Sequence, residues 1–339
     1  LRGNGFLLAV TIVLFFVLYI AGAILYGNRN FTSPQVFLNL FISNAGLIIA
    51  AVGMTFVLIT GGIDISIGSV IGVVCMMLAW MMEVKHMSAV VAIILVLAFG
   101  VIFGLVQGFL VAYLKIQPFI VTLGGMFFAR GMTAVICKEQ VSIVSDKIFT
   151  TLSSFKISLP FGGYLNNRGV AMHPYIYLSV VIALLVVAIS FVILRYTKFG
   201  RAVFAVGGNE QSALLMGLNP KVTKLKVYVL NGFLASLAGF AFCLNSCGGF
   251  VEQARGFEMD AIAAAVIGGT LLTGGVGTVV GSLFGSLIKG IIETIITFQG
   301  TLSSWWTRIV IALLLCFFVI LQSVFKSIRE KRLAQGNEK

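Results

Sequence analysis

The side chains that could do chemistry in this 339-residue chain are a few carboxylates in apolar surroundings. Asp64 lies deepest, in the stretch Gly-Gly-Ile-Asp-Ile-Ser-Ile-Gly-Ser that begins at Gly61. A carboxylate inside a membrane is costly and usually functional, but at a helix start it can accept hydrogen bonds from free backbone amides. We therefore interpret Asp64 first as a cap for the amides of Ser66 and Ile67. A role in a loop that contacts an energy-supplying partner is the alternative.

Glu258 and Asp260 stand at the start of a short apolar segment. Residues two apart do not share a helix face, so a catalytic pair is not expected, and a favourable charge at a helix start explains both. The chain has no G-x-x-x-x-G-K-[ST] phosphate loop, no H-E-x-x-H and no G-x-S-x-G. These are the patterns of nucleotide binding, metalloproteases and serine hydrolases. We predict no catalytic residue, no metal site and no cofactor bound by this chain.

Uncharged polar residues also occur inside long apolar runs. Hydroxyl and amide groups suit a path for a neutral sugar, which needs many donors and acceptors and no fixed counter-charge. The same groups equally often form hydrogen bonds between packed helices. The residues that we predict to line a translocation path are Gln107, Asn231, Asn245 and Thr294.

The composition is that of a membrane protein. The chain is 59% hydrophobic and 10% charged, with a mean hydropathy of +1.09, and apolar runs long enough to cross a bilayer recur along it. The net charge of +12 is spread over loop ends, which argues against nucleic-acid binding. We predict an all-α, polytopic helical bundle that forms one membrane domain, residues 1–325, followed by a basic tail, residues 326–339.

About ten membrane segments fit the sequence, and the eighth is unusually short. It would be about 18 Å long, too short to cross unaided, and it ends in glycine pairs. Interrupted segments of this kind are tolerated where protein or an aqueous cavity covers them, so we expect this one near the bundle centre or the path. The predicted segments are residues 6–26, 36–60, 65–82, 89–114, 119–136, 175–194, 227–247, 261–272, 276–298 and 306–324.

Basic residues predict the orientation, because Lys and Arg accumulate in cytoplasmic loops. They crowd the loop of residues 196–226 and the tail, which predicts a multi-pass membrane chain with both termini in the cytoplasm. The loop of residues 138–174 then lies outside. Within it, Ile148, Phe149, Leu152 and Phe155 predict a short amphipathic helix at the interface.

Two parts of the chain match each other at an offset of 213 residues. Gly61-Gly62 corresponds to Gly274-Gly275, and Gly68 corresponds to Gly281. In both copies an apolar segment reaches a Gly-Gly turn, and small residues follow at a spacing that lets helices approach closely. We predict a parallel internal repeat with both turns on the cytoplasmic side, as is typical of transporters. Chance matching between glycine-rich segments is the alternative.

Residues 199–220 form a polar, basic stretch between apolar runs. Asn209 can cap a short helix there, Glu210 places an acid in its first turn, and Gly217 can end it. A helix this short is not stable alone in water, so it must pack on its own bundle or on a partner. An ordinary loop helix on the membrane surface is the alternative.

Several motifs are specific enough to compare with known families. They are Val52-Gly53-Met54-Thr55, residues 61–69, residues 119–126, Gly207-Gly208-Asn209-Glu210 with Met216-Gly217, and Asp260-Ala261-Ile262-Ala263 with Gly268-Gly269-Thr270. Over nearly the whole chain, they resemble the permeases of bacterial ATP-binding-cassette (ABC) sugar importers of the ribose/xylose/galactoside family. Ile65 and Ile67 stand where the family usually has Leu or Val. Residues 274–278 and 300–307 look most like the galactofuranose-type subgroup.

The resemblance implies a non-catalytic permease subunit in the bacterial cytoplasmic (inner) membrane. It would move a pentose or a hexose, with galactofuranose as one candidate, into the cytoplasm. Its implied partners are an ABC ATPase on the inside that binds and hydrolyses ATP, a sugar-binding protein on the outside, and a second permease, identical or different. It implies an ATPase-coupling loop that contains Arg201, Gly207, Gly208, Asn209, Glu210, Ala213, Met216 and Gly217. Turn and packing roles fall to Gly61, Gly62, Asp64, Gly68, Gly274, Gly275 and Gly281. A self-contained, ion-coupled secondary transporter or channel is the rival hypothesis, and it would need intramembrane charged pairs.

Overall fold

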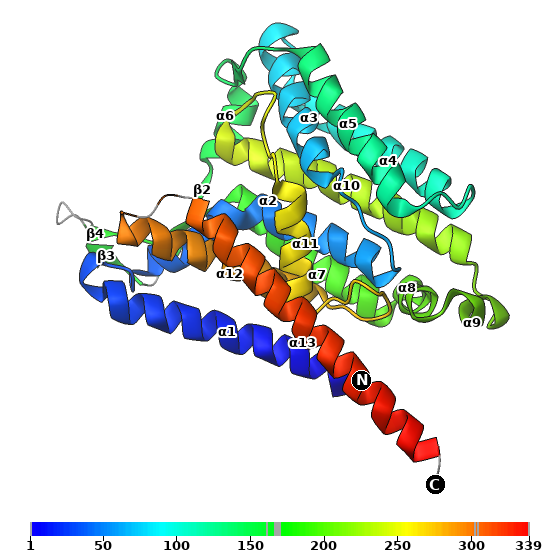
Figure 1. Cartoon of the computed structure of the whole chain (residues 1–339). Helices are drawn as coiled ribbons and strands as arrows, with labels where there is room; N and C mark the ends of the chain where they lie inside the picture. The colour runs from blue at the N-terminus through cyan, green and yellow to red at the C-terminus, as the bar shows by residue number, and fades with distance from the viewer. Residues whose placement is uncertain (1, 161, 166–170, 302, 304, 338–339) are drawn as a thin grey trace.

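The computed structural model describes residues 2–160, 162–165, 171–301, 303 and 305–337, and the chain forms a helical bundle (Figure 1). Parts of the predicted external loop (161 and 166–170) and of the tail (338–339) lie outside the described residues. The helices are α1 (Arg2–Tyr26), α2 (Pro34–Ile59), α3 (Ile67–Ala79), α4 (Ala89–Ala112), α5 (Pro118–Ile136), α6 (Lys147–Ser154), α7 (Leu178–Tyr196), α8 (Lys198–Gly208), α9 (Glu210–Leu215), α10 (Pro220–Ser246), α11 (Phe257–Ile267), α12 (Val279–Gln299) and α13 (Trp305–Asn337).

Nine of the helices in the described part of the chain are long and apolar enough to cross a membrane, and α11 is shorter. The prediction of a polytopic helical bundle is thereby confirmed. A 3₁₀ turn (Gly27–Arg29) follows α1, and one π-helical turn (Trp80–Val84) extends α3. Three short antiparallel ribbons join loops: β1 (Val141–Ser142) with β6 (Gly248–Gly249), β2 (Lys156–Ser158) with β5 (Tyr175–Tyr177), and β3 (Tyr164–Leu165) with β4 (Ala171–Met172).

Three predicted segments differ clearly from the structure. The seventh, predicted from residue 227, begins at Pro220, because Asn219 caps the helix and the basic residues that follow it are helical. The sixth begins at Leu178 and not at residue 175, because Tyr175–Tyr177 pairs with β2. The eighth was placed too late: α11 runs over Phe257–Ile267, whereas the prediction was residues 261–272. It ends early because Gly269 takes a positive φ of 89°, which a continuing helix cannot accommodate.

The centre of the bundle is α2, which packs against α7, α10, α11 and α12. Of its most apolar stretch, 89% is buried, compared with 28% for α4 and 17% for α5. The short helix α11 is also interior, with every residue from Ala261 to Ile267 buried. It packs mainly against α12 and α2, and Figure 1 shows it beside α12. The expectation that the broken segment lies near the bundle centre is confirmed.

Small residues allow the closest helix crossings. On α4, a Cβ at Gly104 would lie 3.1 Å from the Gly232 Cα atom of α10 and would collide with the Tyr228 carbonyl oxygen. A Cβ at Gly281 of α12 would collide with the Gly268 carbonyl oxygen, and one at Gly68 of α3 would meet the Ala254 carbonyl oxygen at 2.9 Å. These close approaches agree with the packing roles predicted for Gly68 and Gly281.

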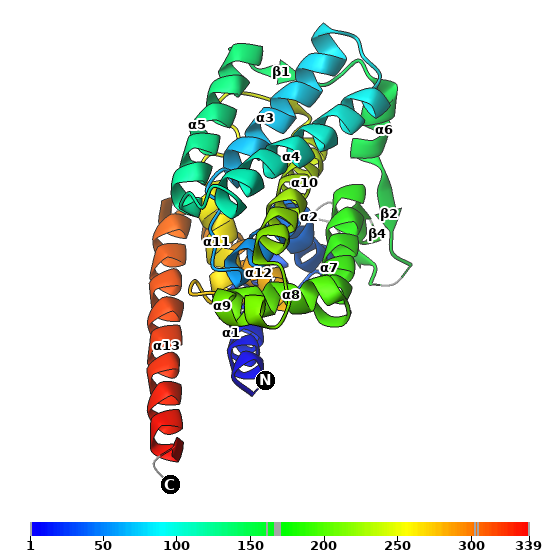
Figure 2. The same cartoon turned by 90° about the vertical axis from the view of Figure 1, so that its right-hand side faces the viewer.

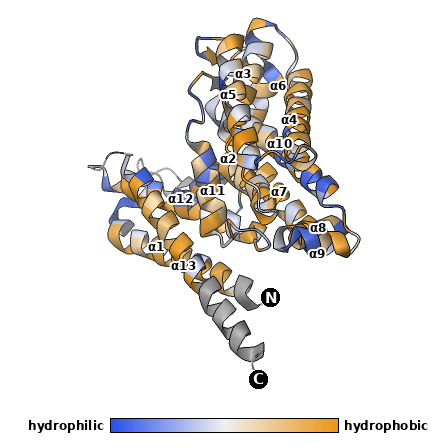
Figure 3. Cartoon of the chain, turned by 45° about the vertical axis from the view of Figure 1, so that its right-hand side comes forward, coloured by the Kyte–Doolittle hydropathy of each residue, from blue (hydrophilic) through white to orange (hydrophobic). Residues whose placement is uncertain are grey.

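The bundle has two distinct ends, which are called here the α9 side and the α6 side. Helices α8 and α9 lie at the first, and α6 with β1 lies at the second (Figure 2). The start of α1 and the end of α13 are also on the α9 side in this view. Apolar residues predominate along α1 and α4, whereas hydrophilic residues gather around α8 and α9 (Figure 3). The predicted amphipathic helix is α6, capped by Asp146.

Candidate functional site

The helix predicted in the basic stretch is present as α9, and its ends have the expected causes. The Asn209 side chain accepts a hydrogen bond from the Ser212 amide at 2.8 Å, which confirms the predicted cap. Gly217 closes the helix with a φ of +80°, a conformation that glycine adopts without strain. Asn219 then caps α10 by accepting from the Val222 amide at 3.2 Å.

One face of α9 is covered and the other is not. Ala213 is fully buried against the bundle. Leu214, Leu215 and Met216 are 61%, 89% and 66% exposed. An isolated helix of six residues is unstable, and three neighbouring apolar side chains in water are unfavourable. The uncovered side of α9 therefore has the character of a contact surface, either for another protein or for the membrane surface.

Immediately before α9, three Gly-Gly pairs from distant parts of the chain meet in what we call the glycine junction: Gly61-Gly62, Gly207-Gly208 and Gly274-Gly275. A Cβ at Gly274 would lie 2.9 Å from the Gly207 carbonyl oxygen and 3.0 Å from the Gly61 amide nitrogen. The amide of Gly275 donates to the Ile59 carbonyl at the end of α2, at 2.8 Å. The two turns of the predicted repeat thus lie side by side, and the Gly207-Gly208 end of α8 packs against them.

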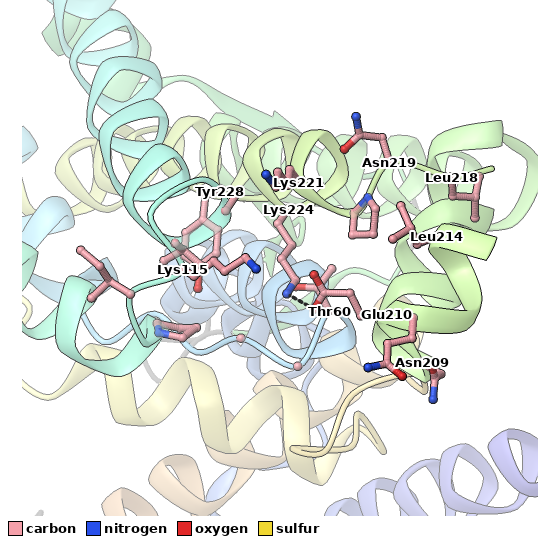
Figure 4. Close-up of a pocket in the computed structure, with 18 of the residues that line it drawn as sticks. Thr60, Lys115, Asn209, Glu210, Leu214, Leu218, Asn219, Lys221, Lys224 and Tyr228 are labelled. Atoms are coloured by element: carbon pink, nitrogen blue, oxygen red, sulfur yellow. Dashed lines mark hydrogen bonds and ion pairs between the residues drawn. The ribbon is translucent and has the colours of Figure 1, made fainter. Parts of the chain in front are cut away.

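A cavity of about 1080 Å³ adjoins this junction, between the α9–α10 connection and the α4–α5 turn (Figure 4). Lys115, Lys221 and Lys224 line it, together with Glu210, whose carboxylate pairs with the Lys224 ammonium at 2.6 Å. Three cations and one anion leave a positive surface beside the apolar face of α9. Tyr228 of α10 lies at the inner end, and its hydroxyl donates to the Ile63 carbonyl at 3.3 Å.

Deeper in the bundle, Asp64 joins three elements and is only 2% exposed. One carboxylate oxygen accepts from the Ser66 amide at 2.8 Å and from the Ser66 hydroxyl at 2.6 Å. The other accepts from the Asn231 amide group of α10 at 2.5 Å. Gln107 of α4 donates to the Ser66 hydroxyl at 2.9 Å.

The predicted cap of the Ser66 amide by Asp64 is therefore confirmed, whereas the predicted cap of the Ile67 amide is not found. The amide of Ile67 is not among the hydrogen-bond donors to Asp64, because Asp64 turns its second oxygen toward α10. A buried carboxylate needs such donors, since an unsatisfied one is costly. Asp64 thus ties the turn after α2 to the helix that follows α9.

The four predicted path residues lie in three separate places. Gln107 and Asn231 belong to the Asp64 network. Asn245 lies at the other end of α10, where it donates to the Ile42 carbonyl at 2.9 Å and accepts from the Ser179 hydroxyl at 3.1 Å. Thr294 lines a second cavity, between α2 and α12. Contact of any of them with a substrate stays a prediction. Arg201, which was predicted for the coupling loop, lies on the exposed face of α8.

Sequence reasoning missed one charged residue, Lys289, in the middle of α12. Its ammonium lies 2.6 Å from a Glu293 carboxylate oxygen and 3.5 Å from an Asp260 carboxylate oxygen of α11. Asp260 thus does more than place a charge at a helix start. The i,i+4 spacing of Lys289 and Glu293 inside an apolar run was the available signal. In the described part of the chain, no three His, Cys, Asp or Glu side chains form a metal-binding group.

Comparison with known proteins identifies the family. Residues 36–319 match the family described as "Branched-chain amino acid transport system / permease component". The chain belongs to this family. It is 45% identical over 303 residues to the inner membrane ABC transporter permease protein YjfF of Escherichia coli (strain K12), covering 89% of this chain and 88% of the relative.

Two further relatives of the permease carry substrate names. The fructose import permease protein FruG of Bifidobacterium longum (strain NCC 2705) is 35% identical over 312 residues, 92% of this chain and 88% of FruG. The ribose import permease protein RbsC of Escherichia coli (strain K12) is 34% identical over 296 residues, 87% of this chain and 88% of RbsC. No solved structure gives a significant match.

Proposed function

We propose that this chain is the membrane-spanning permease of an ABC importer for a monosaccharide and that α9 is the contact with its ATPase. One observation carries the assignment of α9: a short capped helix presents Leu214, Leu215 and Met216 to solvent directly beside the glycine junction. Buried apolar side chains supply most of the energy of protein contacts. The three lysines of the adjacent cavity would favour an acidic partner surface.

The chain supplies the path, and a separate chain supplies the energy. The sequence contains no phosphate-binding loop of the G-x-x-x-x-G-K-[ST] type, so ATP would bind to the ATPase partner. The sugar-import names of the relatives favour this function over an ion-coupled secondary transporter. Among the sugars of this class, we keep galactofuranose as the proposed substrate on the motif resemblance of residues 274–278.

The remaining partners follow from the same assignment. We infer that the α9 side and both termini lie in the cytoplasm, because basic residues gather there, and that the α6 side faces outward in the bacterial inner membrane. A sugar-binding protein would dock on the α6 side. A second permease, identical or different, would complete the path.

The test is affinity purification of the full chain from cells that also contain the ATPase. The double variant L215S/M216S should lose most of the co-purifying ATPase and its sugar-stimulated ATP hydrolysis, because it removes the exposed apolar contact. I148S, an exposed position of α6 on the opposite side, is the matched control for ATPase binding and should retain the co-purifying ATPase. Sugar uptake by the purified chain alone in vesicles, without any ATPase, would refute the proposal.

A further inference from the structure

A second cavity, of about 650 Å³, lies between the α6-side halves of α2 and α12. Cavities of this size accommodate small organic molecules. Its wall is unusually polar for a space between two membrane-spanning helices, since seven of its thirteen lining residues carry polar side chains. The lining residues are Val36, Asn39, Leu40, Ser43, Asn44, Gly290, Glu293, Thr294, Ile296, Thr297, Phe298, Gly300 and Thr307.

The hydrogen bonds described for the polar groups of this cavity do not hold α2 and α12 together, because they run within one helix or the other. The Asn44 amide donates to the Leu40 carbonyl at 2.9 Å, and the Thr294 hydroxyl donates to the Gly290 carbonyl at 2.8 Å. A bond that does cross between the helices lies deeper, between the Thr55 and Ser282 hydroxyls at 2.5 Å. The usual packing role of membrane polar residues therefore does not explain the polar wall.

Asn44 is the best-placed acceptor in this wall. Its side chain is only 2% exposed, and a Cβ at Gly290 of the facing helix would collide with its amide group. Among the described residues, none donates a hydrogen bond to the Asn44 Oδ1 atom. A hydroxyl group bound in the cavity would supply a donor to this oxygen.

Glu293 contributes a charged acceptor. Lys289 lies between two carboxylates, those of Glu293 and Asp260, so the three side chains together keep one negative charge. One Glu293 oxygen is bonded to the Lys289 ammonium, and the side chain, 40% exposed, also lines the cavity. A carboxylate accepts hydrogen bonds from neutral hydroxyls more strongly than a neutral acceptor does. Arg308 also lies close enough to act on Asp260, so the wall has charged acceptors without a large net charge, which suits a neutral polyhydroxylated molecule.

We propose that this cavity is a monosaccharide-binding site formed within one protomer, in which Asn44 and Glu293 accept hydrogen bonds from sugar hydroxyls. Thr294 and Thr297 retain lone pairs toward the cavity, and Phe298 adds apolar surface for the C–H face of a sugar ring. This proposal rests on the proposed import function. The cavity would be the first binding site that the sugar meets as it enters from the α6 side.

The test compares uptake kinetics in cells that contain the complete importer, with radiolabelled D-galactose, which includes its furanose form in solution, D-ribose and D-fructose as probes. N44L, T294V and E293Q should each raise the KM for the imported sugar, by about tenfold, because each removes or weakens one hydrogen bond to it. T133V is the matched control: its hydroxyl also donates to a carbonyl four residues earlier, at 3.0 Å, but it lines neither cavity. Its KM should change less than twofold.

A thiol-protection measurement does not depend on how the other variants fold. Ser43 is exposed in the cavity, so a thiol in S43C should react with a membrane-impermeant maleimide, and the imported sugar should slow this reaction. A thiol in T151C on α6 should react equally with and without sugar. Unchanged KM values in all three variants, or no protection of S43C, would overturn the binding site while import remained intact. Loss of uptake by the wild-type importer for all three probes, with no ATPase bound, would instead contradict the proposed function.

Discussion

The same two antiparallel helices, α2 and α12, meet differently at their two ends. On the α9 side, the end of α2 and the turn before α12 are joined backbone to backbone, through the bond from the Gly275 amide to the Ile59 carbonyl. On the α6 side, side chains make the contact, with Asn44 packed on Gly290, and a polar cavity adjoins it. The Thr55–Ser282 bond lies between these two regions. A helix pair joined through its backbone at one end and only through side chains at the other can change its spacing at the second end with little rearrangement of its core, which suits a site that must bind and then release a solute.

The largest expected effect comes from breaking the end that is joined through its backbone. G207V should abolish transport, lowering it by at least about 100-fold, because its side chain would collide with the Ile59 carbonyl and the Gly275 amide. Uptake is measured after equal membrane insertion has been shown by surface labelling. The control G131A, on α5, has no atom within 4 Å of the added methyl group and should transport within twofold of wild type. Equal loss in both variants would contradict the glycine junction as a close-packed contact.

The next effect separates hydrogen bonds between elements from hydrogen bonds within one helix. N231L should destabilise the protein by about 1–3 kcal/mol, since Asp64 loses a donor while remaining buried. N44L should cost less, because the Asn44 amide bonds only within α2. Denaturation of both purified variants in detergent gives the comparison. A larger loss for N44L would show that the cavity wall is structural, contrary to the proposed site.

A smaller effect is expected at the boundary between the two regions. T55V removes the hydroxyl pair that crosses from α2 to α12 and should cost about 0.6 kcal/mol, the average for membrane hydrogen bonds of this kind. The same denaturation experiment measures it, and T133V, which loses only a bond within α5, is again the control. No difference between the two variants would mean that the Thr55–Ser282 bond does not hold the pair.

The smallest effect concerns the ion pair beside α9. K224M removes the partner of Glu210, whose side chain is 53% exposed, and should change stability by less than about 1 kcal/mol. Its effect should appear instead as a weaker salt dependence of ATPase binding, because one lysine of the cavity is lost. Binding measured at two salt concentrations tests this, and an unchanged salt dependence would exclude Lys224 from the contact.

Local features of the fold were predictable, and long-range contacts were not. The Asn209 cap and the Gly217 stop depend on residues within a few positions, so the ends of α9 could be predicted from the sequence. The end of α11 was missed because hydropathy continues through Thr270 to Leu272 while the backbone turns at Gly269. The contact of Lys289 with Asp260 could not be inferred, since it depends on how α11 lies against α12.

The repeat gave partial information about the glycine junction. The match of Gly61-Gly62 with Gly274-Gly275 predicted that both turns lie on one side, and their contact agrees with this. Nothing in the sequence indicated that Gly207 would lie between them. The roles of the coupling, path and packing residues, and the division into residues 1–325 and 326–339, stay predictions.

Helix α10 has mechanical consequences of its own. Its 27 residues make a rod about 40 Å long that starts at the Asn219 cap, directly after α9, and ends beside Ile42 near the start of α2. Partway along α10, Asn231 donates a hydrogen bond to Asp64 and so provides a pivot point for the helix. A tilt of about 5° around this point would displace the ends by about 1–2 Å in opposite directions. A displacement of α9 would thus move the far end of α10 in the opposite direction, on the other side of the membrane, and no helix would need to unfold.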